Sequence, residues 1–160
     1  MKEIIGIVAA FFGTLGFTVV FRSKRKHIFV IAAGGALSWT VYLLSAIFFN
    51  SEPLCYFIAS ASVGVYSEIF ARVLRTPTTN VFAVAVLPLI PGGGLYYTMR
   101  YAVNNEWDMF LTKGSTTIKI ALAIALGIIS VSTVVKLAKS SALYRKISDA
   151  RIANEHRGHK

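Results

Sequence analysis

The chain has 160 residues, of which 55% are hydrophobic and 15% are charged, and its formal net charge is +10. So much apolar sequence with so few charges excludes an ordinary soluble domain. The positive charge would also suit a nucleic-acid-binding protein, but its grouping along the chain makes that class a poor second to a membrane protein.

The apolar residues form five blocks rather than an amphipathic pattern. Each block is about 17 to 23 residues long, which is the length of helix that crosses a hydrocarbon core of about 30 Å. We therefore expect an all-α polytopic membrane protein, with a transmembrane domain over residues 1–138 and a basic cytoplasmic tail over 139–160. The expected spans cover residues 4–21, 28–49, 54–72, 81–103 and 117–137.

Basic residues gather after the first span, after the third span and in the tail, so with five spans all three groups lie on one side of the membrane. The positive-inside rule places that side in the cytoplasm and the N-terminus outside, as expected in the plasma (inner) membrane of a bacterium. The first block does not look like a cleaved signal peptide, because the basic run follows it instead of preceding it. The first of the three groups is Arg22, Lys24, Arg25 and Lys26.

The third span contains the only acidic residue within an apolar block, Glu68, and Arg72 follows it four residues later. Glutamate ahead of a basic residue at this spacing is the favourable order for a helical ion pair. A carboxylate inside a span is also typical of an ion or proton relay. Two interpretations stay open: Glu68 couples transport to an ion, or the pair only anchors the inner end of the helix.

The fourth span is interrupted near its middle by two prolines and three consecutive glycines. Proline lacks an N–H and glycine carries the largest entropy cost in a helix, so we expect a discontinuous helix there. Broken backbone at membrane depth has to be sheltered by protein or line a water-filled cavity, and the N–H groups of a second half-helix can bind a carboxylate. The alternative is a kink that serves only packing. The candidate substrate-binding residues are Pro88, Pro91, Gly92, Gly93, Gly94, Tyr96 and Tyr97.

Beyond the fourth span, residues 104–108 form a polar turn, and residues 109–117 are mixed in character and suggest a short helix on the outer surface. The single cysteine, Cys55, excludes an intrachain disulfide and a cysteine-rich metal site. No hydrolase or metalloprotease motif is present, so we expect neither an enzyme nor a bound metal or other cofactor.

Three stretches resemble the small membrane subunit of the threonine/serine exporter family: Gly34-Gly35 with Trp39 and Tyr42, residues 67–72 with Pro77, and above all residues 88–96. The resemblance covers roughly residues 4–135 and does not extend to the tail. It implies a partner, a complementary five-helix subunit with its own Pro-Gly break, and the two halves would form an inverted repeat. The substrates it implies are threonine and serine, or in members with separate subunits a dicarboxylate such as succinate.

The leading hypothesis is therefore a subunit of a proton-coupled exporter of small carboxylate-bearing metabolites, which would be anionic or zwitterionic. Besides this substrate and the second subunit, the expected partner is the lipid bilayer, and no nucleic acid is expected. Two other hypotheses are a channel-like pore, which would show no proton dependence, and a non-transporting membrane scaffold that acts through its tail.

Overall fold

The computed structural model describes residues 2–21 and 27–158, with side chains over 3–21 and 27–141. Within these ranges every regular element is helical. The first basic group, residues 22–26, lies outside the described residues, as do the side chains of most of the tail. The elements are α1 (Lys2–Val20), α2 (Ile28–Phe48), α3 (Glu52–Leu74), α4 (Thr78–Ala85), η2 (Leu87–Leu89), α5 (Gly92–Val103) and α6 (Trp107–Gly158).

Four of these helices, α1, α2, α3 and α6, are long and apolar enough to cross a membrane. The segments Thr78–Leu89 and Gly92–Val103 meet the same test only as a pair, and they are bent by 53° at the break between them. The chain is thus an all-α polytopic membrane protein with up to five crossings, and the predicted discontinuity of the fourth is confirmed.

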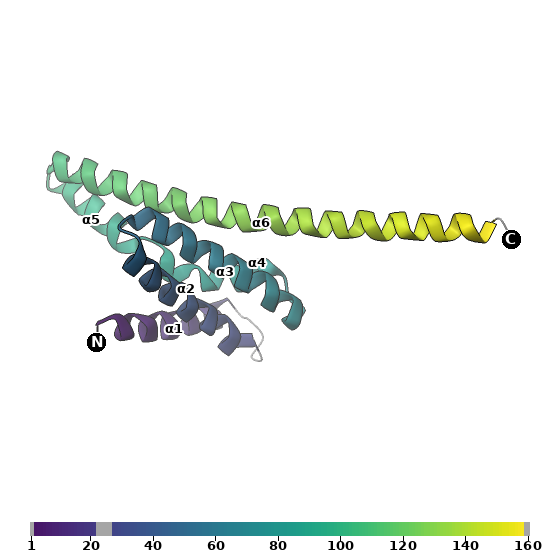
Figure 1. Ribbon diagram of the computed structural model, residues 1–160. Helices are drawn as coiled ribbons and strands as arrows, with labels where there is room; N and C mark the ends of the chain where they lie inside the picture. Colours follow the sequence, from purple (N-terminus) through teal and green to yellow (C-terminus); the bar gives the residue numbers. More distant parts are fainter. Residues whose placement is uncertain (1, 22–26, 159–160) are drawn as a thin grey trace.

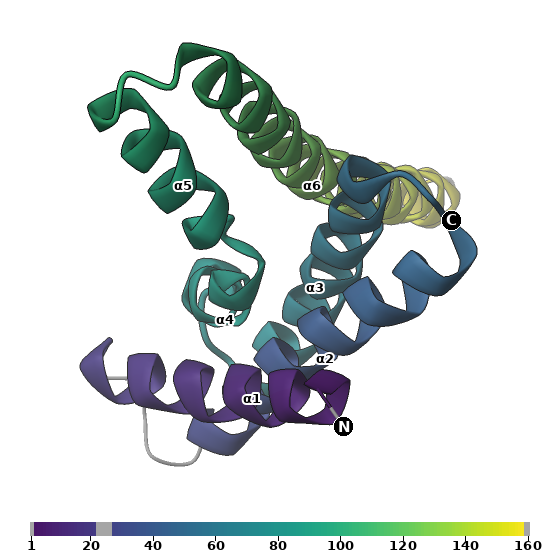
Figure 2. The same ribbon diagram turned by 90° about the vertical axis from the view of Figure 1, so that its left-hand side faces the viewer.

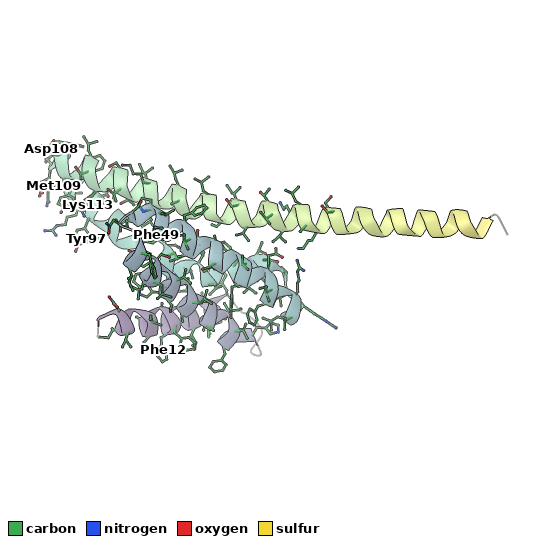
Figure 3. The ribbon with its side chains drawn as sticks, in the orientation of Figure 1. Phe12, Phe49, Tyr97, Asp108, Met109 and Lys113 are labelled. Carbon is green, nitrogen blue, oxygen red and sulfur yellow. The ribbon has the colours of Figure 1, made fainter. Side chains whose placement is uncertain are left out.

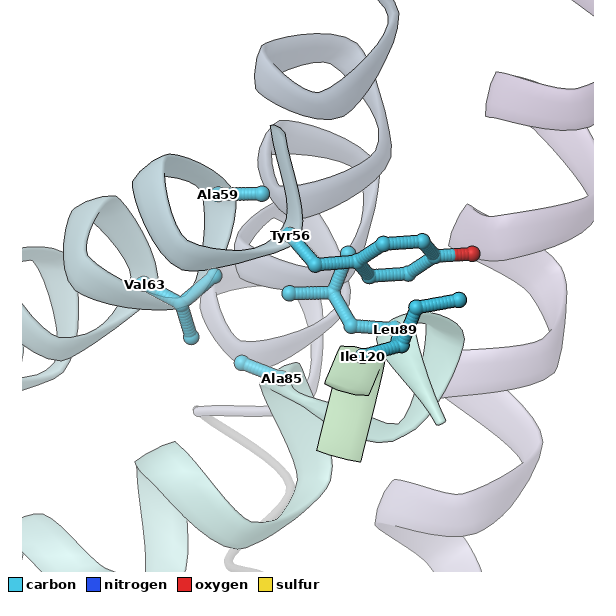
Figure 4. Packing of buried hydrophobic residues seen from close by; sticks show 6 residues of the cluster. All are labelled: Tyr56, Ala59, Val63, Ala85, Leu89 and Ile120. Atoms are coloured by element: carbon cyan, nitrogen blue, oxygen red, sulfur yellow. The ribbon is translucent and has the colours of Figure 1, made fainter. Parts of the chain in front are cut away.

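Helix α3 is the centre of the bundle and packs against α2, α4 and α6, while α1 packs mainly against α2 (Figures 1 and 2). A cluster of buried side chains joins α3 to α4, η2 and α6 (Figure 4). Leu89 of η2 is fully buried in this cluster, which fixes the end of the first half-helix against the bundle. The members are Tyr56, Ala59, Val63, Ala85, Leu89 and Ile120.

Glycines permit the closest helix contacts of the bundle. A methyl group on Gly127 of α6 would lie 2.7 Å from the carbonyl oxygen of Phe57 on α3. One on Gly34 of α2 would lie 2.8 Å from the ring of Tyr66, whose hydroxyl donates a hydrogen bond to the Val30 carbonyl at 2.6 Å. Membrane helices associate through such close packing because lipid supplies no hydrophobic drive between them.

Helix α6 is far longer than the span predicted from sequence. It begins at Trp107, continues without a break to Gly158, and projects well beyond the other helices (Figure 1). Residues 109–117, expected as a separate surface helix, form its first turns. The boundary at residue 138 between membrane domain and tail stays a prediction, because the helix continues across it.

Candidate functional site

At the break in the fourth span, backbone N–H groups bond the carbonyl three residues earlier, as in a 3-10 turn, and not four residues earlier, as in an α-helix. The N–H of Leu89 bonds the Val86 carbonyl at 2.9 Å, and the N–H of Ile90 bonds the Leu87 carbonyl at 3.1 Å. Pro88 lies within the 3-10 turn η2, where its missing N–H ends α4, and Pro91 forms the N-cap of α5. The first half-helix is therefore ended, and a new helix N-terminus is created, within a few residues.

The three glycines at the start of α5 have different surroundings. A methyl group on Gly94 would lie 2.6 Å from Oγ1 of Thr117, so Gly94 allows α5 to approach α6. Gly92 and Gly93 have no other part of the described chain within 4 Å of the position that a methyl group would take. Packing within this chain accounts for Gly94, and it leaves Gly92 and Gly93 open to a ligand or a partner.

Helix α5 contains no buried residue, and α6 is the only element with which it has extensive contact. Figure 2 shows α5 running beside the start of α6 and away from α2 and α3. Tyr96 and Tyr97 lie edge to face, with ring centroids 5.3 Å apart, and are 65% and 46% exposed. Tyr97 lies at the same end of the molecule as Asp108, Met109 and Lys113 (Figure 3). The tyrosines therefore accompany the open glycines on a face that residues 2–21 and 27–158 leave uncovered.

The position of the break relative to α6 follows from two contacts. Gly94 lies against Thr117, and Gly114 lies against Thr98, so α5 runs antiparallel to the first turns of α6. The break lies near the midpoint of the 78–103 segment. On α6 it is level with Thr117, immediately ahead of the apolar run at residues 118–135. About 27 Å of α6 separates Thr117 from Val135 at 1.5 Å per residue, so the break lies closer to the α5–α6 turn than to the opposite end.

Glu68 occupies the opposite end of the bundle, which we call the basic end because Arg72, Lys136 and Lys139 lie there. Its Oε2 atom is 3.2 Å from Nζ of Lys139 on α6 and 3.8 Å from Nη2 of Arg72 on its own helix. The Glu68 side chain is 19% exposed, and those of Lys139 and Arg72 are 56% and 64% exposed. The structure therefore gives Glu68 a second cationic neighbour besides the one that spacing predicts.

The structure does not bring the two groups of candidate residues together. Glu68 is level with Lys139 and the glycines are level with Thr117, which places them about 33 Å apart along the axis of α6. The Leu89 cluster lies between them, because Ile120 contributes to it from the intervening part of α6. The arrangement consists of one open helix N-terminus near the α5–α6 turn and one mixed-charge group at the basic end.

Sequence reasoning missed three residues that define these places. Lys139 was assigned to the tail, although Glu68 contacts it. Thr117 is 5% exposed and forms the surface against which Gly94 packs. Leu89, between the two prolines, anchors the break in the core. The Pro-x-x-Pro spacing could have suggested a buried anchor at Leu89, but nothing local to Lys139 or Thr117 indicates a contact with a distant helix.

Residues 6–134 match the family model described as Threonine/Serine exporter, ThrE. The match includes most of α1, all of α2 to α5 with the break, and α6 as far as Val134, so Lys136 and Lys139 lie beyond it. Neither a curated protein nor a solved structure gives a significant match to the chain.

Proposed function

The chain belongs to the threonine/serine exporter family, and on that basis we propose that it is one membrane subunit of a proton-coupled secondary exporter. Its substrate is a small carboxylate-bearing metabolite, either a hydroxy amino acid such as threonine or serine or a dicarboxylate such as succinate. As a multi-pass membrane protein of a transport family, it supplies a binding surface for the solute and not a catalytic one.

The observation that carries this proposal is the exposed start of α5. The first N–H groups of a helix have no intrahelical acceptor and form a natural site for an anion. At α5 the N–H of Gly92 already donates a hydrogen bond to the Ile90 carbonyl at 2.7 Å, so the free groups belong to Gly93 and Gly94, and Gly93 has open space above its backbone. In this proposal the substrate carboxylate binds there, while Pro88, Pro91 and Gly94 set the backbone geometry and Tyr96 and Tyr97 shape the surrounding wall.

A second subunit completes the site. Polar backbone at a break cannot face acyl chains, and among the described helices α5 has only α6 as a substantial neighbour. A complementary five-helix subunit in inverted orientation would bring a second broken helix to the same face.

Proton coupling is assigned to Glu68. It is the only carboxylate within a predicted span, and two cationic side chains neighbour it without fully burying it. The proposed topology has the basic end in the cytoplasm of a bacterial cell and the N-terminus outside the plasma membrane, as the positive-inside rule requires. Glu68 would then exchange protons near the cytoplasmic side.

The test is export by the paired subunits in sealed vesicles, with and without an inward-directed proton gradient. Gly93→Ala adds one methyl group into the open space at the start of α5, so we expect export to fall about tenfold through loss of a charge-assisted hydrogen bond. Thermal stability should not fall, because no atom of the chain is displaced. Gly13→Ala on α1, where a methyl group also meets nothing, is the matched control. Full export by Gly93→Ala, or export indifferent to the proton gradient, would contradict the proposal.

A further inference from the structure

A pocket of about 350 Å³ lies at the basic end between α3, α4 and α6. Both α4 and α6 border it, but they have little contact with each other, so the pocket is the space left between them against α3. Phe82, Ile128 and Val131 form its apolar wall. Its volume is within the range of about 300 to 1,000 Å³ that small-molecule sites occupy. Its polar lining residues are Glu68, Thr78, Thr79, Ser132, Lys136 and Lys139.

The charges in this pocket have both signs. Glu68 provides one carboxylate, and Nζ of Lys139 lies 3.2 Å from it. The described side chains place no carboxylate within salt-bridge distance of Lys136. The hydroxyls of Thr78 and Thr79 form no hydrogen bond with another described group. The pocket therefore contains the Glu68 carboxylate, which is paired with the exposed Lys139. It also contains the Lys136 ammonium and the hydroxyls of Thr78 and Thr79.

We propose that this pocket binds the zwitterionic backbone of an α-amino acid. The substrate carboxylate is bound by Lys136 with the Thr78 and Thr79 hydroxyls, and the substrate ammonium binds Glu68 in place of Lys139. This inference rests on the proposed export function and narrows its substrate class. A dicarboxylate offers no ammonium, and Glu68 would repel its second carboxylate.

The pocket is a receiving site and does not overlap the break. Along α6 it spans residues 128–139, whereas the break is level with Thr117. The packed Leu89 cluster lies between them, with Val63 fully buried and Ile120 5% exposed. In this proposal a solute that enters at the basic end binds in the pocket before it reaches the glycines.

Binding of L-threonine to the purified full chain, reconstituted in phosphatidylcholine nanodiscs, tests the proposal. Lys136→Gln should weaken the affinity about tenfold, because a hydrogen bond to a charged group is lost. Lys113→Gln is the matched control: it removes the same charge from the same helix, at the end remote from the pocket, and should leave affinity unchanged. Equal affinities for these two variants, or no binding by the wild-type chain, would overturn the pocket.

Two ligand comparisons test the assigned contacts. N-acetyl-threonine keeps the carboxylate but lacks the ammonium, so the wild type should bind it about tenfold more weakly than threonine, and Glu68→Gln should remove that difference. Succinate should not compete with threonine, and competition of equal strength would overturn the assignment. Phosphatidylethanolamine carries the same two charges in a lipid headgroup. If adding it to the nanodiscs abolishes threonine binding, the pocket is a lipid site and the amino-acid assignment fails.

The experiments distinguish failure of the amino-acid-binding proposal from failure of the export proposal. If the paired subunits export threonine and Lys136→Gln binds it as well as Lys113→Gln does, the pocket is wrong and the exporter stands. If the chain binds threonine through Lys136 but the paired subunits export nothing, the pocket stands and the export function is wrong.

Discussion

Glycine has different surroundings in two regions of this membrane protein: helix α5 and the interface between α3 and α6, which we call the seam. In the seam, Gly64 and Gly127 lie so close to the facing helix that an added methyl group would meet the side chain of Val131 or the backbone of Phe57. In α5, Gly92 and Gly93 face open space, and the whole helix buries no residue. One region is packed by the chain itself, and the other is open in the part of the chain that the structure describes.

The difference has a physical origin in the solvent. Apolar faces of α1 and α6 are stable against lipid, so their exposed valines, leucines and isoleucines need no partner. The start of α5 carries unpaired N–H groups and tyrosines, which lipid tails do not satisfy. Exposure on α1 and α6 therefore needs no partner, whereas exposure at the start of α5 supports the second subunit proposed above.

The largest expected effect comes from filling the seam. Gly127→Leu places a side chain against the Phe57 carbonyl, which belongs to helix backbone and cannot rotate away. We expect a loss of about 3 kcal/mol in unfolding free energy from overpacking, and poor recovery of folded protein. Thermal unfolding in detergent measures it, with Gly13→Leu as the control in open space. Similar stabilities for the two variants would show that the seam is looser than its contacts imply.

A smaller effect is expected where the break meets the core. Leu89→Ala removes a fully buried side chain from the cluster, and we expect it to cost about 2 kcal/mol. This is the lower end of the usual range, because lost packing contributes in a membrane protein more than hydrophobic transfer does. Ile90→Ala is the matched control, since Ile90 is the next residue and is 51% exposed. Equal losses would mean that the break is held by its backbone and not by the Leu89 anchor.

The crossings could be predicted from sequence because lipid imposes one strong rule: about 20 apolar residues per helix. The expected spans 28–49 and 54–72 therefore lie close to α2 and α3. The break could also be predicted, since Pro88 and Pro91 remove helical N–H groups wherever they occur. These features depend only on neighbouring residues and on the bilayer.

Features that depend on distant residues could not be predicted. The contact of Lys139 with Glu68 joins residues 71 positions apart, and it needs the register of α3 against α6. The difference between Gly94 and Gly93 needs the position of Thr117. The start of α6 was missed because residues 109–117 are too polar to appear as part of a span. Its continuation could have been predicted, because the chain has no proline or glycine from residue 128 to 157 to end the helix.

The smallest expected effect separates an anchoring role of Glu68 from a binding role. In both ion pairs the basic partner is more than half exposed, so Arg72→Gln should cost only about 0.3 to 0.5 kcal/mol of unfolding free energy, and Lys139→Gln less than about 1 kcal/mol. High salt should shrink both values, which repeated unfolding at increasing ionic strength would show. A carboxylate held this weakly can exchange a lysine for a substrate ammonium. If either substitution instead costs several kcal/mol regardless of salt, Glu68 is a structural element of the seam. Its proposed roles in proton coupling and in amino-acid binding would then both be wrong.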